Sequence, residues 1–295
     1  MLMRRQTIGV AVSLIAFLIA GTATAQERLK VLATFSILGD FVGEVGGRRV
    51  EVTNLVGPSS DAHVYSPAPA DARKVADAKL VVANGLGFEG WFTRLVRASG
   101  TKATVVETTS GVAIRRLADG HADPHAWQSA AHAKTYVTNI RDALIAADPA
   151  GKTGYETNAS AYLVKLDALD RELKALVASI PADRRRIISS HDAFGYFQQA
   201  YAIEFIAPQG VSTESEPSAR DVARIITQIR REKIPAVFLE NVSDPRLMER
   251  IAKESGARIG GKLYSDALTD AKGDAPSYID MMRHNMKQIV SALRE

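Results

Sequence analysis

Three of the six histidines of this 295-residue chain lie in one short stretch, GHADPHAWQSAAH, at residues 120–132. His121 and His125 are four residues apart, a spacing that puts two imidazoles on one face of a helix and lets them hold one metal ion. Pro124 lies between them and Gly120 precedes them, so a regular helix is not expected there. We therefore interpret His125 as one candidate ligand of a larger site and His121 as a bystander.

Other side chains that can bind metal follow predicted strands. His63 lies in the loop after one strand, His191 comes directly after another, and Asp266 follows a third by two residues. In open α/β sheets, ligands bind outside the carboxyl ends of the strands. For each histidine alone, the alternative is an ordinary hydrogen-bonded loop residue. Three imidazoles and one carboxylate would complete a four-coordinate shell for zinc, and we predict that the shell is formed by His63, His125, His191 and Asp266.

The elements that must position these residues alternate between strands and helices. In the first half of the chain we expect strands at 29–35, 50–56, 80–84 and 104–107, and helices at 37–45, 69–78, 91–99 and 129–147. In the second half we expect strands at 186–190, 236–240 and 258–264, and helices at 193–202, 221–232, 245–255 and 278–293. This alternation is typical of βα units with mostly parallel sheets.

A long amphipathic segment lies at mid-chain, with apolar residues every three or four positions over 155–180 and Pro181 at its end. As a helix it would span about 39 Å, more than one small domain. An ordinary surface helix is the alternative, but its position favours a rigid connector. We predict an α/β fold of two Rossmann-like lobes with mostly parallel sheets, joined by one long rigid helix. The expected division is an N-terminal lobe at 26–148, a linking helix at 149–182 and a C-terminal lobe at 183–295.

Residues 1–25 read as a secretory signal peptide. Arg4 and Arg5 form a positive start, residues 8–20 are almost all apolar, and Ala23-Thr24-Ala25 is a small-x-small cleavage signal. A membrane anchor is the alternative, but the apolar run is short for a span and no basic stop-transfer sequence follows. We expect cleavage after Ala25 and a protein located in the periplasm.

The composition excludes several classes of protein. The net charge of +4 falls to +2 when the two arginines of residues 1–25 are removed, which does not suggest a nucleic-acid partner. The chain has no cysteine, so we expect a fold without disulfides, a metal site without thiolates and no lipid attached through a cysteine.

At four places the sequence resembles the zinc- and manganese-binding receptors of bacterial ABC importers, the metal-specific group known as cluster A-I. The motifs are DAHVY, DPHAW, SSHDAF and YSDAL, in the order of the family, and the likeness covers nearly all of the chain after residue 25. The resemblance implies two lobes bridged by one helix and one divalent ion between them. It implies the same four ligands, His63, His125, His191 and Asp266. It also implies delivery of the ion to a cognate permease and its ATPase by a monomeric, non-enzymatic receptor.

The identity of the metal depends mainly on His191. Manganese and iron receptors of this family often carry glutamate at that position, and imidazole suits zinc better than manganese. Many zinc receptors, however, have a long histidine- and acid-rich loop before DPHAW, and here only His121 could represent it. We favour Zn²⁺, with Mn²⁺ or iron as the alternative.

Acidic residues near the ligands are candidates to orient the imidazoles by accepting their second ring N–H. The candidates are Asp61, Asp123, Asp192 and Glu240, although Asp123 also suits a turn and Asp192 could cap a helix. His132 is expected to make local hydrogen bonds, and His284 to be structural or on the surface. A zinc hydrolase is the rival from another class, but the sequence has no HExxH motif and no obvious general base beside the ligands. A surface adhesin would need an anchor, and no cysteine offers one.

Overall fold

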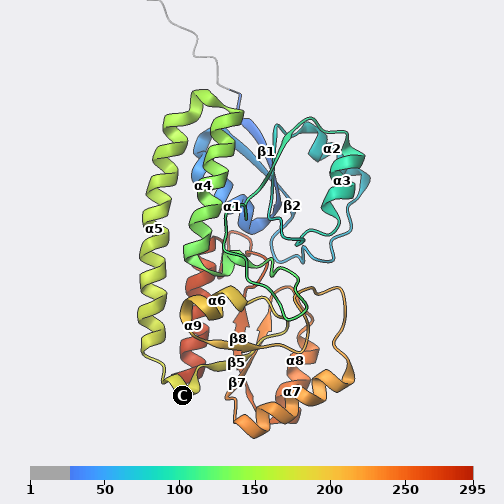
Figure 1. The fold of residues 1–295 in the computed structure, drawn as a ribbon, viewed down its shortest axis with the longest axis vertical. Helices are drawn as coiled ribbons and strands as arrows, with labels where there is room; N and C mark the ends of the chain where they lie inside the picture. Colours follow the sequence, from blue (N-terminus) through green and yellow to red (C-terminus); the bar gives the residue numbers. More distant parts are fainter. Residues whose placement is uncertain (1–26, 295) are drawn as a thin grey trace, which may run out of the picture.

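The computed structural model describes residues 27–294, so the predicted signal peptide lies outside the described residues. The described chain forms two α/β lobes that lie one above the other beside a long helix (Figure 1). Each lobe contains one four-stranded sheet, and all strand pairs in both sheets are parallel. The predicted α/β fold of two Rossmann-like lobes is therefore confirmed.

The N-terminal lobe is built on a sheet of order β2-β1-β3-β4. Its strands are β1 (Leu29–Phe35), β2 (Val50–Val56), β3 (Leu80–Ala83) and β4 (Thr104–Glu107). Its helices are α1 (Ser36–Gly46), α2 (Pro69–Asp77), α3 (Phe92–Ser99) and α4 (Ala130–Ala147). The central strands are continuous apolar runs because helices cover both faces of a parallel sheet.

The C-terminal lobe repeats this plan with the order β6-β5-β7-β8. Its strands are β5 (Arg186–Ile188), β6 (Glu204–Ile206), β7 (Ala236–Glu240) and β8 (Arg258–Leu263). Its helices are α6 (Gly195–Tyr201), α7 (Ala219–Glu232), α8 (Pro245–Ser255) and α9 (Tyr278–Arg294). Short 3₁₀ turns occur at Gly47–Arg49, Ala126–Gln128, Pro149–Gly151 and Ala182–Arg184.

Two details of the C-terminal lobe differ from the sequence prediction. Strand β6 was not predicted, because its three half-buried residues at the sheet edge are too few to show a period. The strand expected at 186–190 ends at Ile188, although Ser189 N still donates to Ile206 O and His191 forms a parallel bridge with Gln209. Both differences lie at the side of the sheet where the candidate ligand is located.

The predicted connector is the 27-residue helix α5 (Lys152–Ala178), which is about 40 Å long. One face is buried against α1, α4 and α9, so the helix contacts elements from both lobes. The buried positions recur every three or four residues, at Tyr155, Ala159, Tyr162, Leu166, Leu169, Leu173 and Val177. The division of the chain into units at residues 149 and 183 stays a prediction, because α9 from the last part of the sequence also packs on α1.

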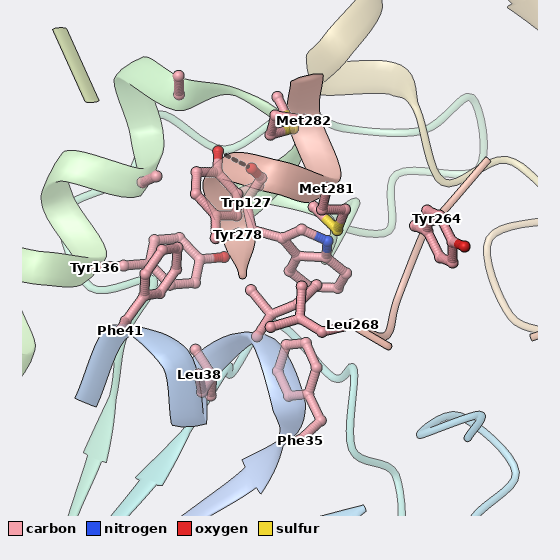
Figure 2. Packing of buried hydrophobic residues seen from close by; sticks show 14 of the residues in the cluster. Phe35, Leu38, Phe41, Trp127, Tyr136, Tyr264, Leu268, Tyr278, Met281 and Met282 are labelled. Carbon is pink, nitrogen blue, oxygen red and sulfur yellow. Dashed lines mark hydrogen bonds between the residues drawn. The ribbon is translucent and has the colours of Figure 1, made fainter. Parts of the chain in front are cut away.

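A continuous hydrophobic core joins the two lobes (Figure 2). Trp127 is fully buried between them, with its ring 5.1 Å from that of Phe35. Its indole N–H donates to the carbonyl of Ser265 at 2.9 Å, and its own carbonyl accepts from Tyr278 Oη at 2.7 Å. Tyr278 in turn packs edge-on against Phe41, at 4.8 Å between ring centroids. This aromatic packing fixes the loops of one lobe against those of the other.

None of the helices between residues 27 and 294 combines the length and the apolar character that a membrane crossing requires.

Candidate metal centre

The four predicted ligands lie together between the lobes. Their nearest donor atoms all lie within 4.8 Å of one another. His125, His191 and Asp266 are fully buried, whereas His63 is 7% exposed. Two donors come from each lobe, as the strand-end argument requires. The site therefore couples four segments that are far apart in the sequence.

Each donor is held on a loop that follows a strand or precedes a helical turn. His63 lies after β2, and His125 immediately precedes the 3₁₀ turn Ala126–Gln128. His191 follows β5 and forms a parallel bridge with Gln209, and Asp266 follows β8. Parallel strands bring such loops to one edge of each sheet, and the two edges face each other.

The separations between donor atoms fit a small cation. His63 Nε2 lies 3.2 Å from His125 Nε2 and 3.4 Å from Asp266 Oδ2. His191 Nε2 lies 3.1 Å from the same Asp266 oxygen. A tetrahedral zinc ion with bonds near 2.0–2.1 Å would separate its ligands by roughly 3.3 Å. The second carboxylate oxygen, Asp266 Oδ1, is buried without a hydrogen-bond partner, so it is free to approach a bound ion.

Carboxylates orient two of the three imidazoles. Glu240 Oε2 lies 2.6 Å from His191 Nδ1, while Glu240 Oε1 accepts the backbone N–H groups of Ser190 and His191 at 2.6 and 3.1 Å. Asp123 Oδ1 lies 2.8 Å from His125 Nδ1 and also accepts the His125 backbone N–H. In a neutral imidazole, a carboxylate beside Nδ1 favours the tautomer with the proton on Nδ1, in which Nε2 can bind an ion. Of the four acids predicted as candidates, Asp123 and Glu240 therefore lie against an imidazole.

Asp61 and Asp192 do not orient rings. Asp61 Oδ1 accepts the backbone N–H of His63 at 2.8 Å, so it positions the loop and not the imidazole. Within the described part of the chain, the Asp192 carboxylate makes no hydrogen bond or ion pair with the His191 ring, and α6 begins at Gly195 without a side-chain cap. Among residues 27–294, no carboxylate is found in contact with Nδ1 of His63, whereas Nδ1 of His125 and Nδ1 of His191 lie 2.8 and 2.6 Å from a carboxylate oxygen.

Sequence reasoning missed Arg115. Its Nη1 donates to Asp123 Oδ2 at 2.7 Å, so the guanidinium fixes the carboxylate that holds His125. No motif marks this arginine, which lies eight residues before Asp123 in an irregular segment.

The charges of the buried groups are strongly coupled. Burial favours the neutral form of His191, but Glu240 and Asp266 outweigh it and raise the pKa of His191 well above its usual value. Burial likewise opposes ionisation of Asp266, yet the neighbouring His191 and His125 hold its pKa well below the usual range. The pKa of Asp123 is lowered because His125 and Arg115 together outweigh its burial. The site therefore contains negatively charged carboxylates that can balance the positive charge of a bound ion.

The other histidines lie outside this cluster. His121 is exposed and lies at the rim of a cavity that reaches His63. His132 was expected to make local hydrogen bonds, but its buried Nδ1 has no partner and its ring packs 5.2 Å from that of Tyr196. Burial lowers the pKa of His132. His284 Nε2 lies 3.0 Å from the carbonyl oxygen of Lys262, a structural role.

Comparisons with known proteins identify the family to which the chain belongs. The family model described as zinc-uptake complex component A, periplasmic, matches residues 31–292. The manganese-binding lipoprotein MntA of Halalkalibacterium halodurans is 35% identical over 276 residues, covering 93% of this chain and 92% of that protein. The manganese ABC transporter substrate-binding lipoprotein PsaA of Streptococcus pneumoniae is 32% identical over 286 residues, covering 92% of this chain and 91% of that protein.

The fold also matches a solved structure over nearly its whole length. The periplasmic zinc binding protein TroA from Treponema pallidum superimposes with a TM-score of 0.87 at 30% identity, covering 90% of this chain and 99% of that chain. The chain therefore belongs to the zinc-uptake component A family and is a substrate-binding protein of a metal ABC importer on the extracellular or periplasmic side, not an enzyme.

Proposed function

We propose that this receptor carries one divalent ion on His63, His125, His191 and Asp266, and that the ion is zinc. The observation that carries the proposal is the convergence of these four buried donors within 4.8 Å, with separations near those of a tetrahedral shell. Four protein donors can shield the ion during transfer, and no open position for a reactive water is needed.

Zinc is favoured over manganese by the chemistry of the donors. Three imidazole nitrogens and one carboxylate form a softer set than the oxygen-rich shells that manganese prefers. MntA and PsaA are named for manganese, whereas TroA is named for zinc, so relatives of similar identity divide between the two metals. The nitrogen at position 191 supports the zinc assignment for this chain.

The finer cellular assignments are also proposals. Export through residues 1–25, cleavage after Ala25 and action in the periplasm are supported by the charge and apolar pattern of that segment. A cognate permease and its ATPase are the partners that a substrate-binding protein of an ABC importer serves. We propose that the receptor works as a monomer, because both halves of the metal site come from one chain.

Competitive metal binding tests the assignment. Purified metal-free protein is titrated with Zn²⁺ and Mn²⁺, separately and in competition, and the metal that co-purifies is identified by elemental analysis. We expect one ion per chain, with Zn²⁺ displacing Mn²⁺. Tight Mn²⁺ binding that Zn²⁺ cannot displace would overturn the choice of metal, and a His191→Ala variant with unchanged affinity would overturn the site.

A further inference from the structure

His63 differs from the other proposed ligands in how it is held. It is 7% exposed, whereas the other three are fully buried, and in the described part of the chain no carboxylate is found in contact with its Nδ1. Nδ1 of His125 and Nδ1 of His191, by contrast, lie 2.8 and 2.6 Å from an oxygen of a buried carboxylate. The ligand with the weakest support and the most access to solvent is the one that can leave an ion at the lowest cost.

A loop of the C-terminal lobe covers the region around His63. This loop, residues 211–216, precedes α7 and lies on the side of the molecule opposite α5 (Figure 1). Val211, Ser212 and Glu214 line one cavity of about 290 Å³ that also contains His63. Thr213 and Glu216 line a second cavity of about 450 Å³, to which none of the four proposed ligands contributes. The loop therefore separates a space that reaches a ligand from one that does not.

A single hydrogen bond ties this loop to the N-terminal lobe. Thr213 Oγ1 donates to Asp61 Oδ2 at 2.6 Å, and within residues 27–294 no other hydrogen bond joins residues 211–216 to that lobe. The other oxygen of Asp61 accepts the His63 backbone N–H at 2.8 Å. One carboxylate thus connects the covering loop to the backbone of a ligand, and movement of the loop changes the support of His63 directly.

Elsewhere the lobes are joined more firmly. Ser265 O accepts from both Trp127 Nε1 and Gln128 Nε2, and Ser59 N donates to Leu268 O at 2.8 Å. Opening at the 211–216 loop requires the loss of one hydrogen bond, whereas opening near Trp127 requires the loss of several and of a packed core. The contact of the 211–216 loop with the N-terminal lobe is therefore the weakest of these connections between the lobes.

We propose that the ion enters and leaves past His63 through the 290 Å³ cavity, and that the Thr213–Asp61 hydrogen bond is the latch that controls its rate. Asp61 and Thr213 are positioning residues, since neither touches the ion. This inference rests on the proposed function, because it takes His63 to be a ligand.

Dissociation kinetics test the latch. Zinc-loaded protein is mixed with an excess of chelator, and the release of Zn²⁺ is followed by stopped flow. Thr213→Val removes the hydroxyl with little change of shape, and we expect release roughly tenfold faster, because a hydrogen bond to a charged group is lost. Thr213→Ser should restore the wild-type rate. Thr227→Val is the matched control, since the Thr227 hydroxyl bonds only to Ala223 O within α7.

Association kinetics test the route. At low ionic strength, Glu214→Gln should slow zinc association about two- to threefold, because it removes a carboxylate from the cavity that reaches His63. Glu216→Gln is the paired control, since its carboxylate lines the other cavity. A slower rate in Glu216→Gln alone would place the route in the larger cavity and overturn the proposal.

The outcomes separate this inference from the proposed function. Equal release rates in wild type and Thr213→Val, with tight stoichiometric zinc binding in both, would contradict the role of the Thr213–Asp61 hydrogen bond. They would not contradict the proposed four-residue site. Failure of the site itself would appear as unchanged zinc affinity in His191→Ala, whatever the kinetics of the Thr213 variants.

Discussion

Glu240 Oε2 lies 2.6 Å from Nδ1 of His191, and both residues are buried at the carboxyl ends of β7 and β5. In the neutral ring a carboxylate at this place favours the proton on Nδ1, and Nε2 lies 3.1 Å from Asp266 Oδ2, on the side of the proposed ion. Because the same carboxylate also accepts two backbone N–H groups, it fixes the loop and the ring together.

Glu240→Gln is expected to weaken zinc binding by about ten- to a hundredfold while the fold persists. A glutamine amide donating toward Nδ1 favours the tautomer whose proton lies on Nε2, where it competes with the ion. Isothermal titration with a competing chelator measures the change. Asp192→Asn is the control, because that neighbouring carboxylate does not touch the ring. Equal affinities for Glu240→Gln and wild type would contradict the orienting role.

His191→Ala and His121→Ala should behave in opposite ways. His191 is a fully buried member of the four-residue cluster, and removing it deletes one donor and leaves Glu240 and Asp266 without their shared partner. Zinc affinity should fall at least a hundredfold. His121 lies at the cavity rim, so its loss should change equilibrium affinity less than threefold. A large loss of affinity in His121→Ala would mean that this histidine is a ligand.

Metal addition should raise the thermal stability of the receptor. An ion that binds only the folded state adds about 2.7 kcal/mol when its free concentration is a hundred times its Kd. At equal free metal, the shift in Tm should be larger for Zn²⁺ than for Mn²⁺ because the donor set is rich in nitrogen. Differential scanning calorimetry measures both shifts, and His191→Ala should abolish most of each. A larger shift with Mn²⁺ would contradict the zinc assignment.

The buried carboxyl of Asp40 should make the free energy of unfolding depend on pH, whether or not metal is bound. Burial raises its pKa to about 6, against the stabilising hydrogen bond from the Tyr278 backbone N–H. Because the folded pKa lies above the unfolded one, the folded state binds more protons between about pH 4 and pH 6. The resulting stabilisation is complete below pH 4 and is lost as the pH rises through 6.

Asp40→Asn should remove this dependence, since asparagine remains neutral and can still accept the Tyr278 N–H. Relative to wild type, the variant should gain up to about 3 kcal/mol in free energy of unfolding between pH 4 and pH 7. Urea unfolding of metal-free protein at both pH values measures the difference. A constant difference across that range would show that Asp40 titrates normally.

Tyr278→Phe should destabilise the junction of the lobes. The Tyr278 hydroxyl donates to the buried Trp127 carbonyl at 2.7 Å, and its loss leaves that acceptor unsatisfied. The free energy of unfolding should fall by about 1–3 kcal/mol. Tyr264→Phe is the matched control, because its ring is also buried but its hydroxyl makes no hydrogen bond among residues 27–294. Equal losses of free energy of unfolding in the two variants would mean that the Tyr278 hydrogen bond is not the cause and that ring packing is.

The fold could be predicted from the sequence where periodicity was strong. Parallel strands bring the loops after them to one edge, which is why His63, His191 and Asp266 could be placed near one another before the structure was known. Strand β6 could not be predicted, because its three residues at the sheet edge are too few to show a periodic pattern.

The contacts between side chains were harder to predict from the sequence than the helices and strands. Glu240 was one of four candidate acids, and the sequence alone could not assign it to His191, because the pairing of β7 with β5 is not visible in the sequence. The Arg115–Asp123 ion pair and the Asp61–Thr213 hydrogen bond both depend on how loops fold back, which no local pattern reveals.

Helix α5 has a consequence for how the molecule comes apart. Its buried face contacts α1 and α4 of one lobe and α9 of the other, and the main core continues through all of them. Neither lobe can lose this helix without exposing its own apolar side chains to water. The receptor should therefore melt as one cooperative unit, and either half produced alone would lack part of its own interior.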